Sequence, residues 1–245
     1  MESYTYDLHM HSCLSPCGDD DMTPNNMVNM AALLGCRILA VTDHNTCKNA
    51  PAAMKVGEQV GVLVIPGMEL CTSEEAHVVC LFENAESALA FDAYVQEHTM
   101  HVPNRPEIFG DQLIMDENDE IIGVLDELLI TATDISVNDV QRLAMEYNGV
   151  AFPAHVDKDA YSVTASLGAI PPEAGFFAAE LSSRAVTEEQ LLLHPELNGM
   201  ILLRDSDAHY LHTMSEDMAR VELPELSVRA VIDLLRGMGE GKFTN

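Results

Sequence analysis

The sequence predicts an α/β protein of the (β/α)-barrel type, and three observations support that prediction. Apolar segments with strand character alternate with segments of helical periodicity, which is typical of βα units in a parallel sheet. Seven or eight such strands occupy about 240 residues, which suits a barrel better than an open nucleotide-binding sheet. The sequence contains neither of the common glycine-rich phosphate loops.

The first third of the chain shows the alternation most regularly, beginning with a strand over residues 4–9. A helix is predicted to open at Thr23 and Pro24, because a capping hydroxyl followed by proline is typical of a helix N-terminus. Its apolar residues recur at helical spacing until Gly35 ends the segment. The following predicted elements are strand 37–42, helix 50–60, strands 62–65 and 78–82, and helix 85–98.

Residues 99–132 interrupt this alternation. Two apolar segments, 112–115 and 120–123, flank an acidic turn, and this pattern predicts a β-hairpin. As an insertion in the barrel, the segment is either a lid over a site or a structural embellishment. Beyond it, Ser136 is predicted to cap a helix, and the remaining predicted elements are strands 150–154, 176–180, 199–203 and 219–223, helix 187–193 and a final helix from Ser227.

The charge balance restricts the partners of this chain. It carries 40 acidic and 12 basic residues, for a formal net charge of −28. Such a charge repels polyanions and argues against a broad nucleic-acid-binding surface. A small phosphorylated substrate remains compatible, because bound divalent metal ions would reverse the sign of the local field.

The composition is that of a globular protein, and we expect a single domain over residues 1–245. An apolar run long enough to span a bilayer is absent, and residues 1–4 lack the features of a signal peptide, so the cytoplasm is the expected location. The six cysteines form no C-x-x-C pair and are expected to be free thiols. The sequence gives no indication of oligomeric state.

Histidines at the ends of predicted strands are the strongest functional signal. His9 and His11 alternate along the first strand, so both imidazoles point to one side. Six of the ten histidines lie at successive strand ends, where a parallel barrel builds its active site. The candidate metal ligands are His9, His11, His44, Glu69, His77, His155, Asp207 and His209.

Such a ligand set exceeds what one ion requires, so two or three metal ions are expected. Mixed imidazole and carboxylate ligation favours manganese, zinc or iron. Glu69 is suited to bridging two ions, because a carboxylate has two oxygens. The acidic loop 19–21 either supplies one further ligand, for which Asp19 is best spaced, or favours the N-terminus of the following helix electrostatically.

Closely spaced divalent ions suit phosphoester hydrolysis, since they activate water and stabilise the entering and leaving oxygens. A serine-nucleophile motif such as G-x-S-x-G is absent. Asp43 is a candidate catalytic residue that either orients an imidazole or carries a proton. Arg184 and Arg204, near the ends of later strands, either hold a phosphate or form ordinary surface ion pairs.

Taken in order, these motifs resemble those of the PHP (polymerase and histidinol phosphatase) family over about residues 4–225. The resemblance implies a distorted (β/α)7 TIM-like barrel, a trinuclear metal site and phosphoesterase activity. It also implies that the eight candidate ligands and Asp19 form the metal site, although the loop before Asp19 is longer than in the usual form. The motifs are Asp7 to Ser12, Met22-Thr23-Pro24, Ala40 to Thr46, Gly67-Met68-Glu69, His77, Pro153-Ala154-His155 and Asp205 to His209.

Within that family, a small phosphate ester or nucleotide is the favoured substrate, with histidinol-phosphate phosphatase or oligonucleotide exonuclease activity as alternatives. Two other classes stay open. An amidohydrolase-like enzyme acting on a C–N bond shares the H-x-H strand, but it usually recruits a lysine at a strand end, and Lys48 and Lys158 fall in predicted loops. A non-catalytic protein that retains the metal cluster for stability is the other alternative.

Overall fold

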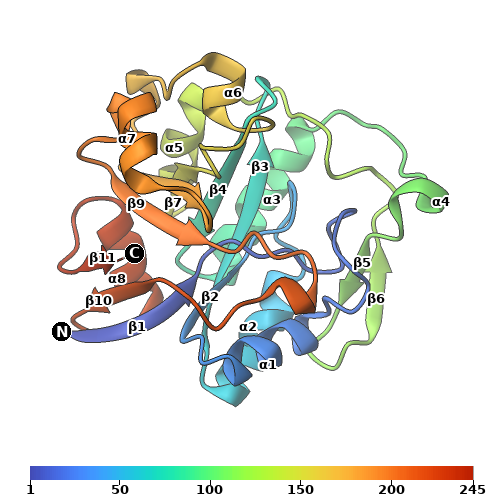
Figure 1. Ribbon diagram of the computed structural model, residues 1–245. Coiled ribbons are helices and arrows are strands. Elements are labelled where there is room, and N and C mark those ends of the chain that lie inside the picture. Colours follow the sequence, from blue (N-terminus) through green and yellow to red (C-terminus); the bar gives the residue numbers. More distant parts are fainter. Residues whose placement is uncertain (245) are drawn as a thin grey trace.

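The computed structural model describes residues 1–244 and is built around a strongly curled sheet of seven strands (Figure 1). Their order across the sheet is β11-β10-β1-β2-β3-β4-β7. The strands are β1 (Glu2–Asp7), β2 (Ile38–Val41), β3 (Leu63–Cys71), β4 (His77–Phe82), β7 (Gly149–Pro153), β10 (Arg220–Leu223) and β11 (Lys242–Thr244).

A parallel pair, β8 (Ala178–Ser182) and β9 (Ile201–Asp205), continues the curve between β7 and β1. An isolated parallel bridge between Met10 and Ala208 joins the two ends of the curve. The seven-stranded sheet and the pair remain separate hydrogen-bonded ladders. The predicted α/β fold of distorted barrel type is therefore confirmed.

The expectation of uniformly parallel strands was wrong for β10, which pairs antiparallel with β1, and for β4. β4 pairs antiparallel with both β3 and β7. The connection from β3 to β4 covers only residues 72–76, too short for the crossover that parallel pairing requires. As a result the first residue of β4, His77, lies at the same edge of the sheet as the carboxyl ends of β3 and β7.

β3 is longer than the predicted strand 62–65 and continues through Pro66 and Gly67 to Cys71. A Cβ atom on Gly67 would lie 2.6 Å from the carbonyl oxygen of Cys80 on β4. Glycine therefore permits the close approach of the two strands at this point. Glu69, expected beyond the strand end, lies within β3 opposite Val79.

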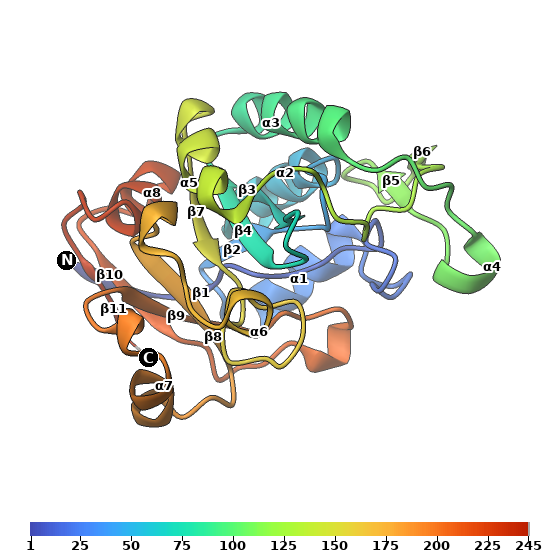
Figure 2. The same ribbon diagram turned by 90° about the horizontal axis from the view of Figure 1, so that it is seen from above.

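Helices cover the outside of the curled sheet (Figure 2). The predicted N-caps are confirmed, since the Thr23 hydroxyl accepts from Asn26 N and the Ser136 hydroxyl accepts from Asn138 N. Among residues 1–244, none of the helices combines the length and apolar character needed to cross a bilayer. The helices are α1 (Pro24–Leu33), α2 (Ala50–Val60), α3 (Ala85–His98), α5 (Val137–Glu146), α6 (Val163–Leu167), α7 (Thr187–Leu193) and α8 (Val228–Leu235).

Buried side chains lie on both faces of the strands, because successive residues of a strand point to opposite faces. On β4, Val79 and Leu81 face the barrel interior, whereas Val78 and Cys80 face the helical layer that contains α3 and α5. Residues of α8 belong to the interior cluster, so this helix packs against the apolar core of the barrel. Each fully buried large side chain there stabilises the fold by about 1.5–3 kcal/mol.

The predicted hairpin in the insertion is confirmed. Strands β5 (Leu113–Met115) and β6 (Ile121–Val124) pair antiparallel, preceded by the short α4 (Pro106–Phe109). Together they form the outlying part at the right of Figure 1. The Asn49 side chain at the start of α2 bonds to Leu113 O (3.1 Å) and Met115 N (2.9 Å). The hairpin is thus fastened to the helical layer.

Candidate metal centre

A single buried carboxylate, that of Glu69, stands at the centre of the predicted ligand set, 1% exposed. Imidazole nitrogens from five histidines lie within 3.3 Å of its two oxygens. Oε1 lies 3.2 Å from His9 Nε2, 3.0 Å from His77 Nδ1 and 3.2 Å from His155 Nε2, and Oε2 lies 3.3 Å from His11 Nε2 and 3.0 Å from His44 Nδ1.

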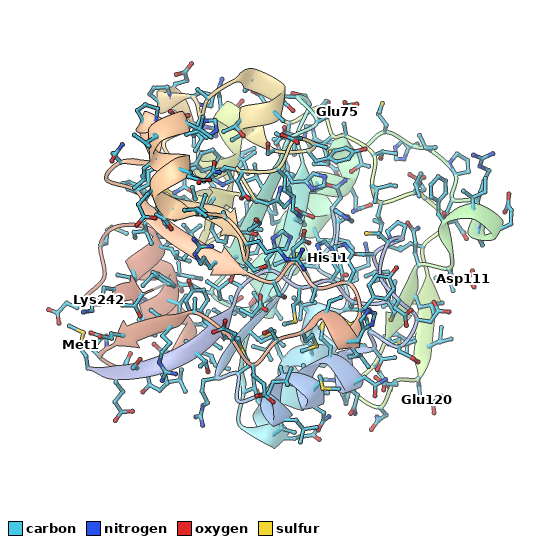
Figure 3. All side chains as sticks on the ribbon, in the orientation of Figure 1. Met1, His11, Glu75, Asp111, Glu120 and Lys242 are labelled. Atoms are coloured by element: carbon cyan, nitrogen blue, oxygen red, sulfur yellow. The ribbon has the colours of Figure 1, made fainter. Side chains whose placement is uncertain are left out.

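The strand edges bring these side chains together. His9 and His11 follow β1, His44 follows β2 and His155 follows β7, while His77 begins the reversed strand β4. Figure 3 shows His11 near the middle of the molecule, where these strand ends converge. The backbone bends sharply here, with positive φ at His155 (31°) and Asp207 (51°). Such strain is typical of functional sites.

The imidazoles of His9 and His11 each form a hydrogen bond through the nitrogen that points away from Glu69. These bonds determine which ring nitrogen faces the cluster. His9 Nδ1 lies 2.7 Å from Glu180 Oε2, and both side chains are fully buried. His11 Nδ1 lies 3.0 Å from Ser15 Oγ, whose hydroxyl donates to Asp43 Oδ1 at 2.7 Å. Because each Nδ1 then carries a proton, Nε2 is the atom through which the neutral form of either ring would bind a metal ion.

This arrangement fits metal ions. The two inward Nε2 atoms of His9 and His11 lie 3.2 Å apart, so the neutral forms of the two rings would direct both lone pairs to one place. In the described chain, buried Nδ1 of His155 has no hydrogen-bond partner, and Nδ1 of His44, although 3.0 Å from Glu69 Oε2, makes no hydrogen bond either. A carboxylate has about four lone-pair sites and cannot accept from five imidazoles at once. Shared cations would satisfy these surplus lone pairs, and three overlapping groups, each with its donor atoms within 4.8 Å, have the required spacing.

The electrostatics of the cluster are strongly coupled. Burial raises the pKa of Glu69, but the surrounding imidazoles outweigh burial and hold this pKa well below its usual range. Burial lowers the pKa of His11, but Asp207 and Glu69 raise it to about 9. Burial together with the neighbouring His11 lowers the pKa of His209 to about 3. The cluster therefore holds ionised carboxylates beside imidazoles of very different basicity.

A cavity of about 500 Å³ opens onto the cluster. Asp207 lies at its edge, with Oδ1 3.4 Å from His11 Nε2 and 3.5 Å from His209 Nδ1. The Lys158 ammonium donates to the other oxygen of Asp207. The cavity is lined by Cys17, His44, Glu69, His77, Ile130, His155, Lys158, Asp159, Ala160, Tyr161, Asp207 and His209.

Comparison of the sequence with known families gives a match. The sequence model of the PHP domain matches residues 7–147, more than half of the chain. The chain belongs to the PHP domain family.

Curated relatives share parts of this PHP chain. A 5'-3' exoribonuclease Rnm of Escherichia coli is 27% identical over 175 residues, covering 69% of this chain and 57% of the relative. A 5'-3' exoribonuclease of Haemophilus influenzae is 35% identical over 79 residues, covering 31% of this chain and 28% of the relative. The chain thus covers less than two thirds of either relative, 57% of the first and 28% of the second.

A solved structure shares the fold. The lesion-specific endonuclease from Pyrococcus furiosus superposes with a TM-score of 0.71 at 17% identity, covering 99% of this chain and 58% of the endonuclease. At this level of identity the likeness concerns the fold.

The structure does not bring every predicted residue of this PHP site into the cluster. The Asp19 amide donates to His209 O (2.9 Å), while its carboxylate accepts from Asp21 N (3.0 Å). The Arg204 guanidinium donates to the carbonyl oxygens of Ser182 (2.9 Å) and Ala185 (2.6 Å), outside the cavity. Arg184 is exposed and does not line the cavity. The phosphate-holding role expected of both arginines therefore has no support in this geometry.

Asp43 also lies apart from the cavity. Both of its oxygens are engaged, with Oδ1 accepting from Ser12 N and Ser15 Oγ at 2.7 Å each and Oδ2 accepting from Ser12 Oγ at 2.6 Å. Of the two predicted roles, this geometry supports orientation of an imidazole, through Ser15 to His11, over proton transfer.

Three residues of the centre were not predicted from the sequence. Glu180 was detectable, because a lone glutamate in the apolar strand β8 is a charge that needs a buried partner. Ser15 carries no comparable signal, since its role depends on the fold of the loop after His11. Lys158 was interpreted only as a loop residue, although it follows His155 closely.

Proposed function

We propose that this PHP protein is a metal-dependent phosphoesterase acting on a small phosphate ester or nucleotide. The single observation that carries the proposal is the Glu69 carboxylate, with five imidazole nitrogens within 3.3 Å. The carboxylate is buried beneath an open cavity large enough for a small ligand.

We propose that two or three ions of manganese, zinc or iron share this donor set. Glu69 would bridge two of them, because each of its two oxygens lies against a different set of histidines. The proposed ligands are His9, His11, His44, Glu69, His77, His155, Asp207 and His209, which include every group of donor atoms found within 4.8 Å of one another. The mixture of imidazole and carboxylate donors suits these metals.

When bound, such ions supply the acidity that makes water nucleophilic at neutral pH and the charge that neutralises a phosphoryl group. The chain's own residues hold and orient the reactants. Glu180 and Ser15 keep His9 and His11 in one tautomer. The Lys158 ammonium, 42% exposed, is placed to bind a phosphate oxygen from the cavity side.

The net charge of −28 supports a small substrate, since only local positive charge at the centre would attract phosphate. A second candidate function is exonucleolytic cleavage of short oligonucleotides, which the names of the curated relatives favour. Comparing a nucleoside monophosphate with a short end-labelled RNA, each over a range of salt, distinguishes the two. Hydrolysis confined to the monophosphate favours the small substrate.

The direct test measures turnover and metal content together. Wild-type protein loaded with manganese is expected to hydrolyse phosphate esters and to hold two or three ions per chain. Glu69→Gln should lose most of both, because the bridging charge is removed. Glu58→Gln, at an exposed position on α2, is the matched control and should behave as wild type. Full metal content without turnover on a panel of phosphate and C–N substrates would favour the non-catalytic alternative.

A further inference from the structure

Tyr161 presents an aromatic ring at the cavity, directly beside the candidate metal centre. Its ring stacks on that of His77, with centroids 5.0 Å apart and planes at 20°. The residue is nevertheless 56% exposed and lines the cavity. One ring face is therefore occupied by the His77 imidazole, while much of the side chain remains open to a ligand.

The backbone at Tyr161 is strained. Its φ is +55°, a left-handed conformation that is costly for a bulky side chain. The conformation is held on both sides, because Tyr161 O accepts from His77 N at 2.8 Å and Ser162 caps α6 through Ala165 N at 3.1 Å. An exposed ring gains too little burial to offset such strain, so core packing does not account for this placement.

The cavity lining is of two chemical kinds. The Glu69 cluster, Lys158 and Asp159 supply charged and polar groups, whereas Tyr161, Ala160 and Ile130 supply apolar surface. The insertion 99–132 contributes Ile130, which is 36% exposed, to the lining of the cavity. This surface fits a ligand with a phosphate at one end and a flat, weakly polar body at the other.

We propose that Tyr161 is a stacking platform for the nucleobase of a nucleotide substrate, a proposal that rests on the proposed phosphoesterase function. The ring and the Lys158 ammonium belong to one short loop after His155, so a single segment would contact both ends of the ligand. Stacking accepts any base, because every base has a flat π face. Tyr161 would therefore select nucleotides over aliphatic phosphate esters without selecting one base.

The test compares an ester that has a base with one that does not. The values of kcat/KM for a nucleoside 5'-monophosphate and for glycerol phosphate are measured for wild type, Tyr161→Asn and Tyr161→Phe. Asparagine removes the ring yet tolerates positive φ, so the fold should be retained. Tyr161→Asn is expected to lower the ratio of the two values by about 5- to 150-fold, the range for loss of one stacked base. Tyr161→Phe should keep the wild-type ratio.

Binding provides a second readout that does not require turnover. Calorimetry of metal-loaded protein is expected to show that Tyr161→Asn weakens the binding of nucleoside monophosphate more than the binding of glycerol phosphate. Tyr161→Gly, also free of strain, replaces Tyr161→Asn if melting shows that the latter is unfolded. An equal loss for both ligands, or a Tyr161→Phe variant that behaves like Tyr161→Asn, would overturn the proposal. Selective binding without hydrolysis would instead contradict the phosphoesterase function and leave the stacking platform in place.

Discussion

His9 Nδ1 and Glu180 Oε2 lie 2.7 Å apart, with both side chains fully buried. The pair joins the end of β1 to β8, elements separated by 171 positions in the chain. It fixes the inward orientation of His9 Nε2 and places a negative charge behind the ring. A partner of this kind raises the basicity of an imidazole ligand.

Removing this partner is expected to weaken metal binding. Glu180→Ala should lower metal affinity by about 10- to 100-fold, because His9 loses its orienting hydrogen bond. Glu180→Gln, which retains an acceptor, should lose less. Competition with a chelator measures the affinity, and Glu173→Ala, at an exposed acidic position, is the control. Unchanged affinity in Glu180→Ala would show that the pair does not support a metal ligand.

Metal-free protein is expected to become less stable as pH rises from about 7 to about 8.5. Burial lowers the pKa of His11 and of His44, but neighbouring carboxylates raise both to about 9, above the usual 6.5. The resulting stability is complete below about pH 6.5 and is lost as pH rises through 9. The pKa values of His77 and His209 are lowered, so these two residues change the stability only below about pH 6.5.

Thermal unfolding of chelator-treated protein measures this trend as a falling Tm. Metal-loaded protein is the control, because metal binds neutral imidazole and should not lose stability over the same pH range. A Tm of the metal-free protein that rises from pH 7 to about 8.5 would contradict the charge coupling within the cluster.

Lys158 is expected to contribute to phosphate binding. Lys158→Met should raise KM by about 10-fold, and should raise the inhibition constant of inorganic phosphate by the same factor. This is the change expected on the loss of one charge-assisted hydrogen bond. Lys55→Met removes a lysine that pairs with Glu117 on the surface and provides the matched control. If phosphate inhibits Lys158→Met as strongly as wild type, the ammonium does not contact the phosphate.

Asn49 is expected to be essential for attachment of the hairpin. Its amide group donates to Ser12 Oγ (3.0 Å) and Leu113 O (3.1 Å), and its oxygen accepts from Met115 N (2.9 Å). Asn49→Ala should lower the free energy of unfolding by about 2–4 kcal/mol, because buried polar groups lose their partners. Urea unfolding measures the change. The control, Asn198→Ala, loses one exposed bond to Pro195 O and should change stability by less than about 0.5 kcal/mol.

The sequence by itself determined the local features of this protein. The caps at Thr23 and Ser136, the 50–60 and 85–98 helices and the hairpin in the insertion follow from short-range chemistry. The histidines that meet at Glu69 were also predictable, because alternation and strand ends place such residues on one edge of a barrel.

Tertiary structure decided what depends on contacts between distant segments. β4 runs in reverse because it pairs antiparallel with β3 and β7 after a short loop, and this pairing places His77 at the common edge. Arg204 was assigned by its position near a strand end, yet nearby carbonyl groups hold its guanidinium outside the cavity. The pairing of Glu180 with His9 is likewise set by the curl of the sheet. Local patterns specify which residues reach an edge, whereas only packing specifies which partner each side chain meets there.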